Sequence, residues 1–211
     1  MHFTGVINLI ELLNQDTLKS FINIGSSDEY GDVNAPQSEI QRESPISPYS
    51  LGKVSATHFL QMLFRTEKFP VTILRLFLTY GPGQSSNRFI PQIISGCLKD
   101  ISFPVSKGEQ LRDFCFIDDV IRAIFLVFDS SKSAGEIINI ASGKPVSIRY
   151  VIENIQNIIE GGYPEFGEID YRSNENMHLY ADVNKAKTLL NWQSKFTLNE
   201  GLLQTIQCLK K

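Results

Sequence analysis

The chain has 211 residues, of which 42% are hydrophobic and 20% are charged, and its formal net charge is -3. This balance is typical of a globular protein with one sizeable core; it argues against a nucleic-acid partner, and no apolar run approaches the roughly 20 residues of a membrane span. The three cysteines are too few and too scattered for a disulfide framework or a zinc site, so we expect a cytoplasmic protein without a signal peptide.

The first 80 residues alternate between helical and strand patterns. Apolar side chains recur at helical spacing over residues 3–15 and again over 49–65. Short apolar runs at 20–27 and 71–80 predict buried strands. The segment between them, residues 31–48, is rich in Pro, Ser and Glu and predicts a loop.

The second half continues the alternation. The patterns predict a strand at 136–142, a short strand at 168–173, and helices at 88–98, 118–129, 147–159, 182–190 and 197–210. Strands separated by helices indicate an α/β fold in which a parallel sheet is flanked by helices, and no linker divides the chain. A sheet of only three convincing strands leaves an apolar edge with unpaired backbone groups, which favours association.

A tyrosine and a lysine lie four residues apart at the start of the second predicted helix. Tyr49 and Lys53 would share one helical face. A lysine ammonium beside a phenol favours the phenolate, and such a tyrosine can exchange a proton with a sugar hydroxyl or carbonyl. Ser26 follows a predicted parallel strand, where such sheets place their chemistry. The alternatives are an exposed tyrosine beside a lysine, and a strand-ending turn at Ser26.

Other polar residues have simpler structural interpretations. Asp118 and Asp119 precede an apolar stretch and are interpreted as the N-cap and first turn of its helix. Arg75 lies inside a predicted strand, which favours a buried ion pair, and Trp192 is expected in the core. The three histidines share no metal-ligand spacing, so no metal site is expected.

Six motifs in order carry a resemblance over nearly the whole chain. They are SSDEYG (26–31), SPYSLGK (47–53), LRLFLTYGPGQ (74–84), GEQLRDFCFIDDV (108–120), INIASG (138–143) and YADVNKAKTLLNW (180–192). Together they resemble the extended short-chain dehydrogenase/reductase family, and within it the nucleotide-sugar epimerases, dehydratases and 4-ketoreductases. The resemblance implies that residues 1–80 form the C-terminal part of a Rossmann domain that binds NAD or NADP. Residues 81–211 would be mainly a small α+β substrate-binding region, with one strand returning near 136–142.

The resemblance also implies roles for particular residues. Ser26, Tyr49 and Lys53 match the catalytic residues, with Tyr49 as acid and base. Lys53 would also hold the nicotinamide ribose, and the backbone at Phe77 would contact the nicotinamide. The residues implied in binding a nucleotide-diphosphate sugar are Asn87, Arg88, Arg112 and Arg172. Arginine suits that role because its planar fork binds phosphate oxygens in a bidentate way.

The quaternary structure is implied in the same way. Family members commonly form homodimers through two helices, and these correspond to residues 3–15 and 49–65 of this chain.

Three departures from the family pattern keep alternatives open. Leu78 replaces an asparagine that helps many members to hold the substrate, and Asp28 replaces the glutamate of the dehydratases. The sequence also contains no glycine-rich phosphate-binding turn and opens on a predicted helix, as if it began after the front of the Rossmann domain. We therefore expect an epimerase or 4-ketoreductase by resemblance, with no turnover by this chain alone. The alternatives are a 4,6-dehydratase, or an inactive remnant that dimerises or binds a nucleotide diphosphate.

Overall fold

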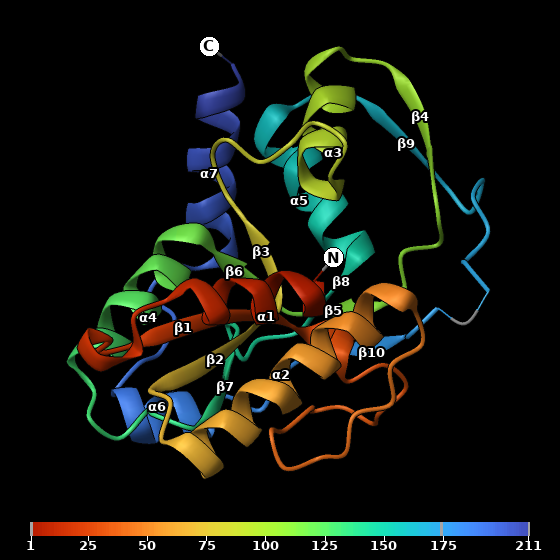
Figure 1. Ribbon diagram of the computed structural model, residues 1–211. Coiled ribbons are helices and arrows are strands. Elements are labelled where there is room, and N and C mark those ends of the chain that lie inside the picture. The colour runs from red at the N-terminus through yellow and green to blue at the C-terminus, as the bar shows by residue number, and fades with distance from the viewer. Residues whose placement is uncertain (1, 174, 211) are drawn as a thin grey trace.

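The computed structural model describes residues 2–173 and 175–210. Its central sheet has three parallel strands in the order β1-β2-β7, and Figure 1 shows helices on both sides of it. These strands are β1 (Phe21–Ser26), β2 (Val71–Leu76) and β7 (Ile137–Ile140). The predicted α/β fold with a parallel sheet is therefore confirmed.

The two faces of this sheet contact different helices. Ile73 of β2 belongs to a buried cluster with α1 (His2–Leu12) and α2 (Pro48–Glu67). The next residue, Leu74, belongs to a cluster with α4 (Ile117–Asp129) and α6 (Asn184–Leu190). This alternation follows from the pleat, because successive side chains of a strand point to opposite faces. Trp192 is buried in the second cluster, as expected.

The helix α2 begins and ends where its sequence directs. The Ser47 side chain accepts a hydrogen bond from the Ser50 backbone and forms a capping box, with Pro48 in the first turn. The helix ends at Lys68, which adopts the left-handed conformation. These signals fix where α2 begins and ends, and they place Tyr49 in its first turn.

A second cluster of helices and short strands forms the other part of the chain (Figure 1). Three helices, α3 (Phe89–Leu98), α5 (Ile148–Ile159) and α7 (Leu198–Leu209), surround its apolar core. The short strands are β3 (Leu78–Tyr80), β4 (Ser102–Val105), β5 (Leu111–Arg112), β6 (Phe114–Phe116), β8 (Val146–Ser147), β9 (Tyr163–Phe166) and β10 (His178–Leu179). They form the pairs β3-β6 and β4-β9 and the small sheet β10-β5-β8.

Two strand predictions are corrected. The run 71–80 is two strands, because Phe77 donates its N–H to Ile140 while Leu78 pairs with Phe114 in a different sheet. Residues 168–173 form no strand; the strand of this region is β9, which ends before Gly167, whose positive φ of 93° turns the chain.

Two details of helix ends and faces are also corrected. Asp118 and Asp119 both lie in the first turn of α4, and the N-cap position is Phe116, so the N-cap prediction is wrong. Leu9 of α1 is 48% exposed, whereas Ile10 is buried, so the buried face of α1 is narrower than its periodicity suggests.

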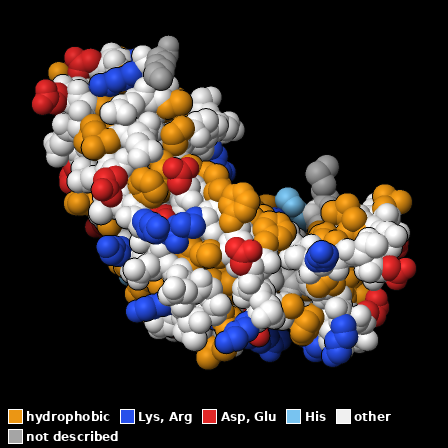
Figure 2. Space-filling view, turned by 90° about the vertical axis from the view of Figure 1, so that its left-hand side faces the viewer, with side chains coloured by type: hydrophobic (Ala, Val, Ile, Leu, Met, Phe, Trp, Pro, Cys, Tyr) orange, Lys and Arg blue, Asp and Glu red, His pale blue; other side chains and the backbone are white. Residues whose placement is uncertain are grey.

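The outer edge of β1 is open within residues 2–173 and 175–210. No strand of this part pairs with it, and the side chain of Ile24 is 37% exposed there. On α4, the exposed residues Ile121, Phe125 and Phe128 form an apolar stripe at helical spacing. Figure 2 shows hydrophobic side chains across the middle of the side of the molecule that carries α4. None of the described helices combines the length and apolar character that crossing a membrane requires.

Candidate active site

The first turns of α2 lie against the C-terminal end of β1. The Lys53 ammonium donates a hydrogen bond to the Ile24 carbonyl at 2.8 Å, and its nitrogen is 6.0 Å from the centroid of the Tyr49 ring. The Tyr49 ring is partly exposed and packs edge-on against His2 of α1 at 5.0 Å. The fold thus brings Tyr49 and Lys53 to the strand that ends at Ser26.

The environment of Lys53 perturbs its titration. Burial lowers the pKa of the Lys53 ammonium, and the negative charge of Glu29 acts in the opposite direction without cancelling this effect. An ammonium has three N–H donors, so Lys53 keeps donors for other acceptors besides the Ile24 carbonyl.

Ser26 ends β1 and starts the short 3-10 helix η2 (Ser27–Glu29). Its hydroxyl accepts a hydrogen bond from the Asp28 backbone at 3.2 Å, and its own N–H donates to the Glu29 carboxylate at 2.9 Å. The interpretation of Ser26 as a strand-ending turn is therefore confirmed. Its catalytic role stays a prediction.

A buried ion cluster lies directly behind this end of the sheet. Arg75 Nη2 is 2.9 Å from Glu29 Oε2 and also hydrogen-bonds Glu43, and the side chains of Arg75 and Glu29 are fully buried. The guanidinium lies over the ring of Tyr30 at 4.6 Å. The expected ion pair of Arg75 is confirmed. Its two acidic partners were not identified from the sequence, where the only signal is an arginine within an apolar strand that requires a counter-charge.

The Glu43→Gln variant should reveal the pH window of this cluster. Burial raises the pKa of the Glu43 carboxyl, but the hydrogen bond and charge of Arg75 outweigh it and hold the net value below the ordinary 4.5. A lowered folded-state pKa stabilises the fold above the unfolded value, and this contribution is lost as pH falls through the folded pKa. Wild type should therefore be more stable than Glu43→Gln at pH 7, with the difference shrinking as pH falls below about 4.5. Urea denaturation of both proteins from pH 3 to pH 7 measures it, and a difference that does not change with pH would contradict the ion pair.

Phe77 and Leu78 lie where the chain leaves the central sheet. Phe77 is buried and directly follows β2. It lies beside Ser26 at the carboxyl ends of the parallel strands β1 and β2, and its ring packs near Tyr30. Leu78 is half-buried and begins β3. The backbone of Phe77 thus lies at the carboxyl ends of the strands, where the predicted contact with a nicotinamide would occur.

The four predicted substrate-binding residues fall into two groups: Arg112 and Arg172 both contact Glu175, and Asn87 and Arg88 precede α3. Arg112 is buried and forms an ion pair with Glu175, while its pKa is lowered by burial in spite of Glu175 and of Asp28, which follows Ser26 closely. Arg172 is exposed, and its carbonyl accepts from the Glu175 backbone at 3.0 Å. Asn87 and Arg88 are exposed in the turn before α3. The charge of Asp28, two residues after Ser26, acts on the Arg112 guanidinium.

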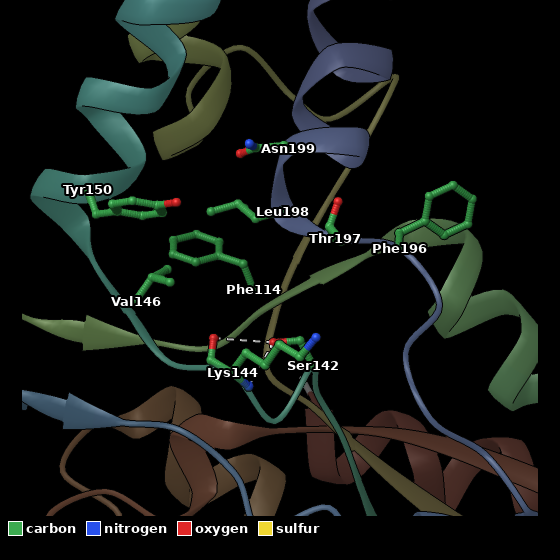
Figure 3. A pocket seen from close by; sticks show the side chains of 9 residues that line it. All are labelled: Phe114, Ser142, Lys144, Val146, Tyr150, Phe196, Thr197, Leu198 and Asn199. Atoms are coloured by element: carbon green, nitrogen blue, oxygen red, sulfur yellow. Dashed lines mark hydrogen bonds between the residues drawn. The ribbon is translucent and has the colours of Figure 1, made fainter.

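A separate cavity of about 300 Å³ lies between the N-terminal ends of α5 and α7, beside the turn that follows β7 (Figure 3). Its lining is largely apolar: Phe114, Val146, Phe196 and Leu198 lie around it, with Tyr150, Lys144, Ser142, Thr197 and Asn199. Ser142 donates to the Asp113 carboxylate, which also accepts from the Gly143 backbone. None of the residues predicted to be catalytic lines this cavity.

Comparison with known proteins decides the family. Residues 1–141 match the model of the NAD-dependent epimerase/dehydratase family. The chain belongs to this family. The UDP-glucuronate 4-epimerase of Thermodesulfobacterium geofontis is 29% identical over 100% of this chain and 65% of its own length. The dTDP-glucose 4,6-dehydratase of Haemophilus influenzae is 28% identical over 89% of this chain and 60% of its own length.

Solved structures agree with this assignment. The UDP-glucuronic acid 4-epimerase of Bacillus cereus, crystallised with UDP-glucuronic acid and NAD, superposes with a TM-score of 0.91 at 30% identity. That match covers 99% of this chain and 67% of the epimerase. The present chain spans somewhat less than two thirds of the length of the two curated relatives named above, the 4-epimerase and the 4,6-dehydratase.

The residues at the end of β1 fit one end of a nicotinamide dinucleotide. Lys53 offers an ammonium and Tyr49 a phenol beside the carboxyl ends of parallel strands, which is where such sheets bind nucleotides. The sequence has no glycine-rich turn for the pyrophosphate. No metal-binding cluster of His, Cys, Asp or Glu occurs in the described part of the chain, 2–173 and 175–210.

Proposed function

We propose that this family member carries the catalytic and substrate-binding part of an NAD(P)-dependent nucleotide-sugar epimerase or 4-ketoreductase. The observation that carries the proposal is the position of Tyr49 and Lys53 on one face of α2, with Lys53 bonded to β1 two residues before Ser26. In this proposal residues 1–80 serve the dinucleotide, and residues 81–211 serve mainly the substrate, with β7 returning to the central sheet.

Each group has a defined task in the proposed reaction. The Tyr49 phenolate takes a proton from a sugar hydroxyl as hydride leaves the carbon, or the Tyr49 phenol gives its proton to the corresponding carbonyl as hydride arrives. The Ser26 hydroxyl donates a hydrogen bond to the same sugar oxygen, and the Lys53 ammonium donates to the ribose hydroxyls of the dinucleotide. A bound nicotinamide would supply the hydride acceptor or donor for this chemistry.

Substrate binding is proposed to depend on arginine. Arg112 would bind the diphosphate of the sugar nucleotide in a bidentate way. Arg112 Nη2 bonds the Glu175 carboxylate and Nη1 bonds the Leu111 carbonyl, so a phosphate would compete with these acceptors for the guanidinium. Arg172, Asn87 and Arg88 would close over the nucleotide from exposed segments.

Two alternatives have specific support. A 4,6-dehydratase is favoured by relatives of that name, but Asp28 is one methylene shorter than the glutamate expected there. A module that dimerises or binds a nucleotide diphosphate without catalysis is favoured by the lack of a glycine-rich turn in the 211 residues. We propose that the chain alone does not turn over.

Titration of the purified chain with NADH, followed by nicotinamide fluorescence, tests the proposal. We expect no saturable binding up to about millimolar NADH, because the 211 residues contain no glycine-rich turn whose backbone N–H groups could bind the pyrophosphate of NADH. UDP should still bind, and Arg112→Gln should weaken it at least tenfold, as expected for a lost charged hydrogen bond. Lys99→Gln, on an exposed residue after α3, is the control.

Either result of the NADH titration is informative. Saturable NADH binding that disappears in Lys53→Ala would show that this chain forms its own cofactor site, and the expectation of no turnover would be wrong. Failure to bind both NADH and UDP would reject the nucleotide-binding proposal in all its forms.

We further propose a homodimer through α1 and α2. These helices expose large apolar side chains, which bury favourably in an interface: Phe3, Leu9, Leu12, Leu51 and Met62. Light scattering should show a dimer, and Leu12→Asp should weaken it at least tenfold because a charge would be desolvated. Ile40→Asp is the matched control, since Ile40 is 95% exposed in the loop 31–46. A dimer unaffected by Leu12→Asp would place the interface elsewhere.

A further inference from the structure

Three structural elements converge on one buried carboxylate, that of Glu29 in η2. Its Oε1 accepts from the Ser26 backbone at 2.9 Å. Its Oε2 accepts from the Thr57 hydroxyl of α2 at 2.8 Å and from Arg75 Nε of β2 at 3.1 Å. The Glu29 side chain is fully buried, so water cannot replace these donors. The carboxylate therefore ties the end of β1 to α2 and β2.

The donor from α2 comes from the face that carries the proposed catalytic groups. Thr57 follows Lys53 by four residues and Tyr49 by eight, so the three side chains share one side of the helix. The approach depends on a glycine, because a Cβ on Gly25 would lie 2.6 Å from Glu29 Oε1. The sequence thus leaves space at β1 for the carboxylate that reaches α2.

We propose that Glu29 is a positioning residue, which sets the register between Ser26 and the Tyr49–Lys53 face of α2. The inference rests on the proposed function only in taking these three groups as the reacting set. Glu29 holds α2 to the strand at Thr57, one helical turn beyond the contact of Lys53 with the Ile24 carbonyl. Two points of attachment fix both the sliding and the rotation of α2 along β1. A glutamine could not replace Glu29, because one carbonyl oxygen cannot accept from all three donors.

NMR spectroscopy of Thr57 variants of the full chain tests the inference. Thr57→Val keeps the volume of the side chain but removes its hydroxyl, whereas Thr57→Ser keeps the hydroxyl. We expect Thr57→Val to shift the Tyr49 ring signals and the Ser26 amide signal, and to speed hydrogen exchange at Ser26 at least tenfold. Thr57→Ser should retain the wild-type signals. Thr66→Val is the control on the same helix, because the Thr66 hydroxyl bonds to Met62 of its own helix.

Unchanged signals of Tyr49 and Ser26 in Thr57→Val, together with a lower thermal midpoint, would overturn the proposal and leave Glu29 as a stabilising residue only. Equal behaviour of the Val and Ser variants would do the same. If Thr57→Val does not fold, Glu29→Gln gives a second measurement, in which the Ser26 amide signal should move as its acceptor loses charge. These readouts need no ligand, so a failure of NADH and UDP to bind rejects the proposed function without deciding the role of Glu29.

Discussion

Replacing Arg75 by methionine should destabilise the fold by about 3–5 kcal/mol, because it leaves buried carboxylates without their counter-charge. Arg75 is fully buried and contacts Glu29 and Glu43, whose side chains are 0% and 10% exposed. A loss of this size should lower the thermal midpoint of a chain of this length by about 10 °C. Circular dichroism with heating measures the shift directly.

The exposed ion pair between Lys185 and Glu136 is the matched control. Its side chains are 28% and 41% exposed, so water replaces the partner when the pair is broken. Lys185→Met should therefore change the free energy of unfolding by less than about 1 kcal/mol. If Arg75→Met were as stable as this control, the buried cluster would contribute little, and the carboxylates would have to find other partners or protons.

Replacing Asp119 by alanine should cost about 2–4 kcal/mol, since a hydrogen bond to a charged group contributes about 1.5–3 kcal/mol and this carboxylate accepts from two backbone N–H groups. The Asp119 side chain is buried and accepts from the backbones of Lys195 and Phe196 at 2.9 Å and 3.0 Å. These bonds hold the connection between α6 and α7 to the first turn of α4. The backbone bond from Trp192 to the Asp119 carbonyl should survive the change.

Its neighbour provides the control for this prediction. Asp118 is exposed in the same helical turn. Asp118→Ala removes only a favourable interaction with the helix dipole, worth about 0.3–1 kcal/mol. Urea denaturation of the two variants compares them, and equal losses would show that the bonds of Asp119 to residues 195 and 196 do not support the fold.

The helices were predictable because their signals are local. The apolar spacing of α5 and the capping residues of α7 lie within single segments, and both helices occur within a residue or two of their predicted bounds. The strands β2 and β7 of the central sheet were predictable for a related reason, since a strand buried on both faces reads as a short apolar run. The small sheets were not, because strands of two or three residues such as β5 and β10 carry no periodicity of their own.

In the candidate site, too, local features were predictable from the sequence and long-range contacts were not. The sequence by itself determined the family, the parallel α/β fold and the shared helical face of Tyr49 and Lys53, because four-residue spacing on a helix is a local property. Only the tertiary structure decided that Lys53 contacts Ile24, and that Arg75 meets Glu29 and Glu43 from 46 and 32 residues away. Such contacts depend on how elements pack, and a buried charge requires a partner without specifying where in the chain that partner lies.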